Sequence, residues 1–378
     1  MKPDIGNYEY AARHQKARVL MEKNNLSALL ITEPTNLFYF TGASYFGEMS
    51  FPRPAVLIIP RKEKSILITH EFHLPIDWDG DIREYRKVGE MPIEIVKKAF
   101  EEIGCKMGQV GAELGREQRL GISYQDFLRV RDVLPAISFV DAADIFWQLR
   151  MVKSEAEIAI ITKACKMQDS IFKATFEAVE TGMTTQEIKN LFQRVIIESD
   201  ADFGWVIVCL GGYDSRQAAG SSQPDLRLKK NDLLWVDLGV VLNGYHTDYC
   251  RAMVPTGASS SQLEKWGKIH KILEAGVEAT IAGIPSFDLY RAQVDTAEKL
   301  NIDMTSWPAQ RFGHGSGLHT TEPPYISLDD DTILEPGMIL HIEPGCIEKD
   351  GIYVLEEQVL VTDSGSKVLS HAPWNLQA

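Results

Sequence analysis

One carboxylate in the middle of an apolar run constrains what this chain can fold into. Leu-Leu-Trp-Val precedes Asp237, and Leu-Gly-Val-Val-Leu follows it. A lone buried carboxylate is costly, so it must be paired, protonated or bound to a metal ion. Glu356 poses the same problem, because Tyr-Val-Leu precedes it and the apolar residues 359–361 follow closely. A single acid of this kind can simply face solvent at a strand edge. Two acidic strands together with a glycine-flanked histidine favour a metal site.

Five potential metal ligands follow one another in the last third of the chain. They are Asp237, Asp248, His314, Glu343 and Glu356. Four carboxylates and one imidazole offer hard oxygen ligands and one nitrogen, which suits manganese, cobalt, iron or zinc better than a thiolate site would. The sequence therefore predicts a centre for two divalent metal ions.

The segments around these residues resemble the pita-bread metallopeptidases, the family that includes Xaa-Pro dipeptidase (prolidase), aminopeptidase P and methionine aminopeptidase. Their pattern D-x-G-x-x-x-x-G-Y-x-[ST]-D-x-x-R matches residues 237–251 without a gap. The later patterns G-H-G-x-G-L, I-E-P-G and E-[DE]-x-V-L-V-T match residues 313–318, 342–345 and 356–362. The resemblance covers most of the chain.

This resemblance implies an α+β protein of two domains. Residues 1–150 would form a smaller α/β domain of the creatinase N-terminal type. Residues 151–378 would form the pita-bread catalytic domain, a curved antiparallel sheet covered by helices. By the same resemblance we expect a homodimer.

The resemblance also implies a role for each candidate ligand. Asp237 would chelate one metal ion, Asp248 and Glu356 would bridge both ions, and His314 and Glu343 would complete the second. Two such ions lower the pKa of a shared water and polarise an amide carbonyl. The family assigns to the residue matching Glu343 the transfer of a proton from the nucleophile to the leaving nitrogen.

Two histidines of the family's hydrolases are missing here. Those enzymes read G-H-G-I-G-L-x-x-H-E-x-P, and the second His helps bind substrate and steady the tetrahedral intermediate. In residues 313–324 that position is Thr321. A further family His would fall near residues 219–221, yet the chain has no His between His73 and His246. Thr321 is therefore the expected substrate contact.

Nearby imidazoles partly offset this loss. If residues 318–322 are extended, side chains two apart share a face, so His319 points the same way as Thr321 and toward the metals. We therefore expect a catalytic role for His319. An ordinary hydrogen-bonded His is the alternative.

The same parity argument concerns two more histidines and one tyrosine. It puts His246 on the face of Asp248 and His341 on the face of Glu343, so that one of them could donate a ring N–H to a ligand carboxylate. For His246 the ordinary structural role is favoured. Tyr245 is a candidate for the substrate pocket, although aromatic residues more often belong to the core.

Length, charge and cysteine usage agree with this interpretation. A chain of 378 residues is too long for one ordinary core, and its net charge of -14 disfavours nonspecific binding to nucleic acid or acidic membranes. Residues 1–18 lack the apolar run of a signal peptide, and no apolar segment is long enough to span a bilayer. Five scattered cysteines without a CxxC pattern indicate thiols in a reducing cytoplasm.

Hydrophobic periodicity divides the chain near residues 149–153. Before that point helical and strand patterns alternate, which predicts a mixed sheet with helices on its faces. The predicted helices are 8–23, 93–103 and 124–133, and the predicted strands are 28–32, 55–59, 65–69 and 137–140.

After that point, capping boxes and one turn organise the chain. The predicted boxes are Ser154-x-x-Glu157, which opens a helix through about Val179, Thr184-x-x-Glu187 and Ser261-x-x-Glu264. Asn243-Gly244 is a strong hairpin signal between predicted strands at 233–242 and 245–254.

Three functional hypotheses remain: an Xaa-Pro peptidase for short peptides, a small-molecule C–N hydrolase or lyase on the same scaffold (creatinase, ectoine hydrolase and a dimethylsulfoniopropionate lyase share it), and a non-catalytic binding protein. The complete ligand set argues against the last, because buried acids without metal are costly. Thr321 in place of a His separates the first two. Ser316 is not favoured as a nucleophile, since it lacks a G-x-S-x-G elbow. We predict a metal-dependent hydrolase acting on a short peptide, with a small amide or amidine as the alternative substrate.

Overall fold

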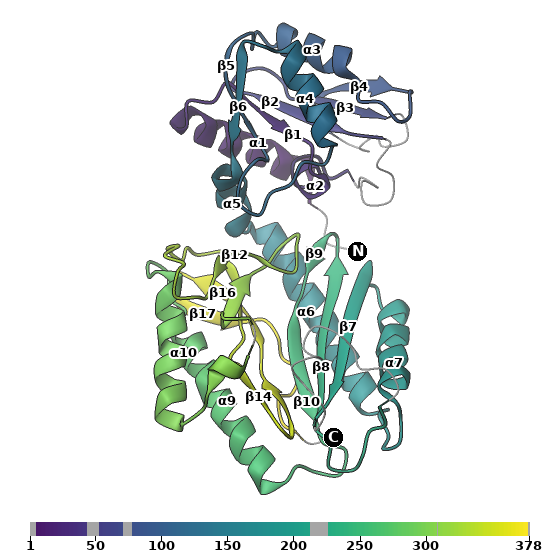
Figure 1. The fold of residues 1–378 in the computed structure, drawn as a ribbon, viewed down its shortest axis with the longest axis vertical. Coiled ribbons are helices and arrows are strands. Elements are labelled where there is room, and N and C mark those ends of the chain that lie inside the picture. Colours follow the sequence, from purple (N-terminus) through teal and green to yellow (C-terminus); the bar gives the residue numbers. More distant parts are fainter. Residues whose placement is uncertain (1–4, 44–52, 71–77, 212–225, 308, 377–378) are drawn as a thin grey trace. The chain divides into compact units, whose positions relative to one another are not determined.

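The computed structural model describes residues 5–43, 53–70, 78–211, 226–307 and 309–376. The chain divides between Arg150 and Met151 into two compact units (Figure 1). Each unit has its own hydrophobic core. None of the helices in the described ranges has both the length and the apolar character needed to cross a membrane.

The unit Ile5–Arg150 is built on one mixed sheet of six strands in the order β4-β3-β2-β1-β5-β6. The pairs β1–β2 and β2–β3 are antiparallel, and the other three pairs are parallel. The strands are β1 (Ala28–Ile31), β2 (Val56–Pro60), β3 (Ile66–His70), β4 (Asp81–Tyr85), β5 (Gly108–Ala112) and β6 (Ile137–Asp141). The helices are α1 (Asn7–Lys23), α2 (Pro34–Thr41), α3 (Ile93–Glu102), α4 (Tyr124–Val133) and α5 (Ala143–Met151). The predicted mixed sheet is confirmed.

The unit Met151–Ala378 holds antiparallel sheets, and four helices cover them in the part of the unit that the structure describes. The first sheet contains β7 (Phe203–Leu210), β8 (Leu234–Leu242), β9 (Tyr245–His246) and β10 (Tyr249–Met253). The second has the order β12-β11-β13-β16-β17, with β11 (Gly313–Gly315), β12 (Glu322–Tyr325), β13 (Ile339–Ile342), β16 (Glu357–Thr362) and β17 (Gly365–Val368). A ribbon of β14 (Gly345–Glu348) and β15 (Gly351–Val354) and the short helix η2 (Met304–Ser306) complete the unit.

The helices lie outside these sheets, as the resemblance implied. Helix α6 (Glu155–Phe176) packs on β8 and α7 (Thr185–Glu198) on β7, whereas α9 (Ser260–Ala279) and α10 (Ser286–Leu300) cover the second sheet (Figure 1). One core joins both halves, since Trp235 of β8, Trp266 of α9 and Leu340 of β13 belong to the same buried cluster. This shared core holds the two sheets in a fixed relation.

Two of the three predicted capping boxes are confirmed, those of Ser154 with Glu157 and of Thr184 with Glu187. The third prediction is wrong. The N-cap of α9 is Ser259, whose box partner is Gln262, so the helix begins two residues earlier than Ser261 predicted. Residues 259–261 are all serine, and Gln serves at N3 as well as Glu does, so the sequence offered two registers.

The Asn243-Gly244 turn is confirmed, and both residues have positive φ (49° and 80°), as a type I′ hairpin requires. The strand predicted at 245–254 is interrupted, however. β9 ends at His246, and Thr247 binds Val240 through its backbone N–H. The interruption lets Asp248 lie directly before β10.

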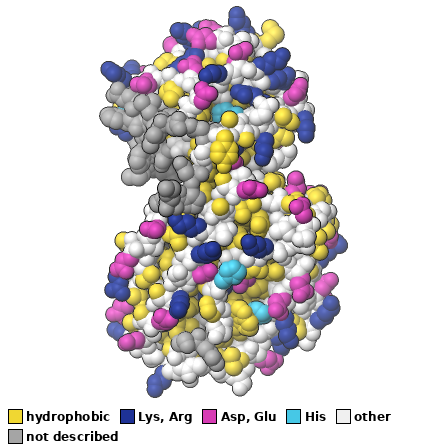
Figure 2. All heavy atoms as spheres, turned by 180° about the vertical axis from the view of Figure 1, so that it is seen from behind, with side chains coloured by type: hydrophobic (Ala, Val, Ile, Leu, Met, Phe, Trp, Pro, Cys, Tyr) yellow, Lys and Arg dark blue, Asp and Glu magenta, His cyan; other side chains and the backbone are white. Residues whose placement is uncertain are grey.

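Charged side chains of both signs are interspersed on the face shown in Figure 2. An even mixture of this kind keeps the net negative charge from being concentrated in one area of that face.

Candidate metal centre

The first sheet supplies two acids. Asp237 lies in β8 opposite Cys250 of β10, and Asp248 precedes β10 by one residue. The two carboxyl groups are hydrogen-bonded to each other, and this bond acts together with burial on the pKa of both. The hairpin thus aims two carboxyl groups at one point.

The second sheet supplies the rest. Register places His314 of β11 opposite His341 of β13, which in turn lies opposite Gln358 of β16. Glu343 follows β13 directly, and Glu356 precedes β16 directly. Paired residues on neighbouring strands share a face of the sheet. The candidate ligands of the second sheet therefore lie in a strand or directly beside one, on one face.

His314 is oriented by its own backbone. Its Nδ1 lies 2.9 Å from the carbonyl oxygen of Gly315, and because a carbonyl only accepts, Nδ1 carries the proton. The other nitrogen, Nε2, lies 3.6 Å from Asp248 Oδ2 and 4.0 Å from Glu356 Oε1. Burial lowers the pKa of His314 to about 3, so the ring is neutral near pH 7 and presents a lone pair to the acids.

Burial also makes the acids reluctant to ionise. It raises the pKa of Asp237 to about 7 and, with the charge of Asp237, that of Glu343 to about 8. Burial and the neighbouring carboxylates raise the pKa of Asp248 and of Glu356 well above their ordinary values. Without a cation, these four groups resist ionisation near neutral pH.

The unsatisfied atoms of this cluster test whether it fits metal ions. Among the described residues, buried atoms without a hydrogen-bond partner include Asp237 Oδ1, Asp248 Oδ1, Glu356 Oε1 and His341 Nδ1. Native proteins rarely leave buried polar atoms unsatisfied, and four in one cage are suited to binding a cation. In each of two groups of three residues, the ligand atoms all lie within 4.8 Å of one another. The groups are Asp248, His341 and Glu356, and His314, Glu343 and Glu356. The residues present fit divalent metal ions.

Glu357, the acid that follows Glu356 in the chain, binds an arginine instead of joining the cage. The Arg251 guanidinium, fully buried, donates to both carboxylate oxygens of Glu357 at 2.9 and 3.0 Å and to the backbone oxygen of Glu356 at 2.7 Å. Glu357 is thereby neutralised, and only Glu356 is left to the cage. Arg251 is the final Arg of the pattern matched by residues 237–251, and Glu357 is the second acid of the pattern matched by residues 356–362.

Arg311 was not singled out from the sequence. Its charge lowers the pKa of Glu343 and of Asp248, and its guanidinium lies over the ring of Tyr325, 5.1 Å from the centroid. Arg311 is partly exposed, and its charge also lowers the pKa of His314 and of His341. Its position three residues before His314 was the only feature of the sequence that could have pointed to it.

His319 and Thr321, the residues expected to meet the substrate, lie in an irregular segment. Residues 317–321 form bends rather than a strand, so the assumption that aligned His319 with Thr321 is wrong. The His319 side chain is 39% exposed, and its Nδ1 lies 3.9 Å from Glu322 Oε1, which also accepts from the His319 backbone N–H. Thr321 is partly exposed just before β12. Both remain accessible beside the metal-centre segment.

Tyr245 does not lie in an open pocket. Its side chain is buried, and its hydroxyl donates to Glu157 Oε1 of α6 at 2.7 Å. This contact ties the hairpin to the helix, so the structure gives Tyr245 the core role that the sequence left as the alternative. His246 is likewise bound to its surroundings, since Thr320 Oγ1 lies 3.0 Å from its Nδ1. The positions 219–221, where a family His was missing, lie outside the described residues.

Ser316 and the cysteines also have structural partners. Ser316 is fully buried, and its hydroxyl contacts His341 and Gln358 rather than His319, so no nucleophile is presented there. All five cysteines are buried and free, as expected.

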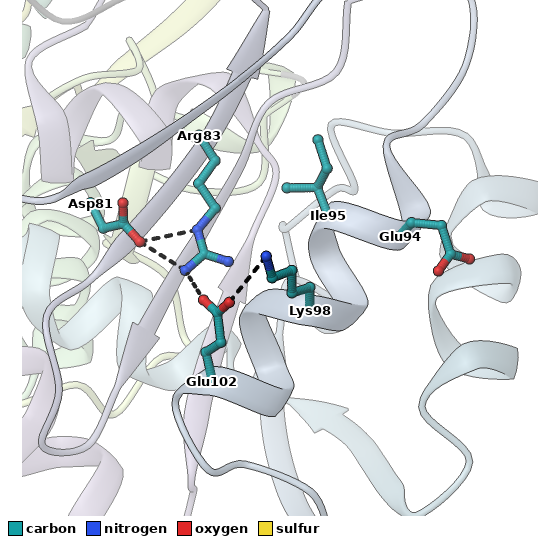
Figure 3. A pocket seen from close by; sticks show the side chains of 6 residues that line it. All are labelled: Asp81, Arg83, Glu94, Ile95, Lys98 and Glu102. Carbon is teal, nitrogen blue, oxygen red and sulfur yellow. Dashed lines mark hydrogen bonds and ion pairs between the residues drawn. The ribbon is translucent and has the colours of Figure 1, made fainter.

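A groove of about 490 Å³ in the unit Ile5–Arg150 is a different kind of feature. Arg83 binds Asp81 and Glu102, and Lys98 binds Glu102, so the groove is lined by side chains that neutralise one another (Figure 3). It holds no unsatisfied cluster comparable with the cage.

Comparison with known proteins gives two family matches. Residues 159–363 match metallopeptidase family M24, and residues 13–152 match the creatinase/prolidase N-terminal domain. A Xaa-Pro dipeptidase of Pyrococcus horikoshii is 28% identical over 363 residues, covering 93% of this chain and 94% of that protein. A Xaa-Pro dipeptidase of Pyrococcus furiosus is 26% identical and covers 95% of this chain and 97% of its own length.

Solved structures show the same fold. The prolidase from Pyrococcus horikoshii OT3 superimposes with a TM-score of 0.79 at 24% identity, covering 97% of this chain and 99% of that one. A recombinant prolidase from Thermococcus sibiricus gives 0.84 at 23% identity, with 98% and 100% covered. The α+β architecture expected from the sequence is thereby confirmed.

Proposed function

This chain belongs to metallopeptidase family M24, and from that premise we propose that it is a metal-dependent peptidase of the Xaa-Pro type, which cleaves short peptides before proline. The observation that carries the proposal is the buried cage, in which acids from two sheets converge with unsatisfied atoms. The relatives that are Xaa-Pro dipeptidases support the choice of substrate.

In this proposal Asp237, Asp248, His314, Glu343 and Glu356 hold two divalent ions, drawn from manganese, cobalt, zinc or iron. When bound, such ions lower the pKa of a water near neutrality and polarise the scissile carbonyl. Each residue contributes an atom that is already directed into the cage, so little reorganisation is needed.

Glu343 is the proton carrier of the proposal. It is partly exposed, unlike Asp248 and Glu356, and so can meet both the attacking water and the substrate. Burial and the charge of Asp237 raise its pKa to about 8 in the absence of a cation, which supports a role in proton transfer. We assign to it the transfer of a proton from the water to the leaving nitrogen.

Thr321 and His319 are proposed substrate-facing residues. The Thr321 hydroxyl can hydrogen-bond a substrate carbonyl, and the partly exposed His319 imidazole can reach a charged or polar end of the peptide. The Glu322 carboxylate, which accepts from the His319 backbone, fixes the bend that presents this imidazole.

One observation favours a second candidate, a small-molecule C–N hydrolase. Thr321 stands where the family's peptidases carry a histidine. The side chain that meets the substrate is therefore shorter and carries no charge at any pH. A cyclic amidine or guanidino acid, which carries its own positive charge, needs no imidazole there.

An activity panel tests the two candidates. Protein stripped with a chelator and reloaded with each ion separately would be assayed on Xaa-Pro dipeptides, on matched Xaa-Ala dipeptides and on cyclic amidines and guanidino acids. The proposal expects metal-dependent turnover of Xaa-Pro substrates and at least a tenfold preference over Xaa-Ala. Turnover confined to the amidines or guanidino acids would support the second candidate instead.

A homodimer and a cytoplasmic location are part of the proposal. The resemblance supports the first, and five buried free thiols support a reducing compartment. Light scattering on the purified protein tests the oligomeric state.

A further inference from the structure

The Nδ1 atom of His341 points toward the acids of the cage. It lies 3.1 Å from Glu356 Oε1, and neither atom makes a well-aligned hydrogen bond among the described residues. A looser contact joins the His341 ring to the backbone of Asp248. The His341 side chain is fully buried. At this distance the two atoms are near enough to bond but are not aligned to do so.

A shared metal ion explains this spacing. Ligand atoms at about 2.0–2.2 Å from one ion, and separated by an angle of about 90–110°, lie roughly 3.0–3.4 Å apart. The Nδ1–Oε1 distance falls in this range. Asp248 completes the group, since its ligand atom lies within 4.8 Å of both others.

The far nitrogen of His341 is tied to a buried polar chain. Nε2 lies 2.8 Å from Ser316 Oγ. Gln358 donates from Nε2 to the same oxygen at 3.3 Å and to the carbonyl of His246 at 3.4 Å, and its Oε1 accepts from Cys165 Sγ at 3.1 Å. Because the His246 carbonyl only accepts, the Gln358 amide is fixed as donor, and Ser316 Oγ keeps a second acceptor position for His341.

The result is a repeated arrangement. His314 donates its far N–H to Gly315 O and turns Nε2 inward, while His341 can donate its far N–H to Ser316 Oγ and turn Nδ1 inward. The two rings are stacked, with centroids 4.7 Å apart and planes 22° apart. A metal-binding His usually donates its other N–H in this way, which fixes the tautomer.

We propose that His341 is a second imidazole ligand of the metal centre, so that one ion is held by Asp248, His341 and Glu356 and the other by His314, Glu343 and Glu356. Asp237, hydrogen-bonded to Asp248, lies beside the first group and would add its carboxylate to that ion. Ser316 and Gln358 are positioning residues that hold the His341 ring. The inference rests on the metal-binding part of the proposed function and is independent of the substrate.

A second nitrogen has a chemical consequence. Imidazole suits zinc, cobalt or iron, whereas manganese prefers carboxylate and water. With an imidazole on each ion, both sites favour the former metals. The ratio of zinc to manganese affinity should therefore fall when His341 is replaced.

X-ray absorption of the zinc-loaded wild-type protein tests the proposal without relying on a variant. With both sites filled, the fine structure should show on average one imidazole per zinc ion. An average of one imidazole per two zinc ions would mean that His314 alone is a ligand, and would overturn the proposal. A stripped protein that takes up no zinc would instead reject the metal centre of the proposed function.

Variants provide a second readout. His341→Ala and His341→Gln should halve the imidazole content and weaken one of the two zinc-binding events by at least about tenfold in calorimetric titration. His246→Ala, which removes an imidazole just outside the cage, is the matched control and should leave the absorption spectrum unchanged. Circular dichroism checks that each variant is folded. Folded His341 variants with wild-type imidazole content and zinc affinities would also overturn the proposal.

Discussion

Arg251 of β10 and Glu357 of β16 form a bidentate ion pair, with nitrogen–oxygen distances of 2.9 and 3.0 Å, in which Arg251 is fully buried and Glu357 nearly so. The pair joins the two sheets from which the metal cage is assembled. It also separates two consecutive acids by role, since Glu357 is neutralised by Arg251 and Glu356 is left among like charges. Replacing each acid by its amide should therefore have opposite effects on the stability of the metal-free protein.

Glu357→Gln should destabilise the protein strongly. The substitution leaves the Arg251 charge buried without its partner, and breaking such a pair costs about 3–5 kcal/mol. Chemical denaturation of the chelator-treated variant and wild type at pH 7 measures the difference in the free energy of unfolding. A loss below about 1 kcal/mol would show that the pair does not hold the sheets together.

Glu356→Gln should stabilise the metal-free protein while abolishing tight metal binding. The amide cannot ionise, so it removes a carboxyl group whose pKa is raised by burial and by Asp248, Glu343 and Asp237. The same denaturation experiment should give a higher free energy of unfolding than wild type with chelator, and a lower one with saturating metal. A destabilised metal-free variant would argue that Glu356 is satisfied without a cation.

The stability of the metal-free protein should fall as pH rises from 6.5 to 8. In the unfolded chain carboxyl groups are ionised throughout this range, and histidines with their ordinary pKa of 6.5 are mostly neutral. In the folded protein Asp237, with a pKa of about 7, and Glu343, with a pKa of about 8, still hold protons. The folded state thus binds more protons, and the free energy of unfolding decreases by roughly 1.4 kcal/mol per pH unit for each carboxyl that remains protonated.

Saturating zinc or cobalt should remove this slope, because the cation replaces the protons. Thermal or chemical denaturation across the same pH range, with chelator and with metal, provides the comparison. Below pH 6.5 the low pKa of His314 acts in the opposite direction, so the test belongs above that value. A flat or rising profile in the chelated protein would contradict the electrostatics of the cage.

His319→Ala should lower kcat on Xaa-Pro dipeptides by about tenfold or more while sparing metal content, because general acid–base or polar contacts of this type contribute about 10²-fold or more.

Thr321→His should raise the activity on Xaa-Pro dipeptides by restoring an imidazole at the family's position. Steady-state kinetics with metal analysis of each variant measures both. An unchanged rate in His319→Ala would leave that residue a structural role, and no gain in Thr321→His would favour the small-molecule hydrolase.

Much of this fold could be predicted from local patterns. Helices α3, α4, α6 and α7 and most core strands follow from periodicity or caps. Helix α1 was also predicted, although it has no side-chain N-cap. Several elements were not predicted, among them α5, α10 and β7, and three others have weak signals. β5 contains two glycines, and α2 begins with proline after Glu33 as its N-cap rather than a more usual capping residue. β4 is largely exposed and charged, so it lacks an apolar pattern.

The site was harder to predict in its details. Spacing and resemblance located the acids and His314, but a single sequence carries no register between strands. The pairing of His314 with His341 and of His341 with Gln358 became apparent only in three dimensions. Tyr245 was misplaced for the same reason, because whether an aromatic residue faces a pocket or a helix depends on tertiary packing.

The central claim is that the buried acids form a cage for divalent cations. Calorimetric titration of chelator-treated protein with zinc or cobalt, combined with elemental analysis, tests it most directly. The account predicts two ions per chain in the wild type, and loss of tight binding together with hydrolytic activity in Asp248→Asn. Wild-type protein that binds no ion, or a demonstrably metal-free Asp248→Asn protein that retains activity, would contradict it.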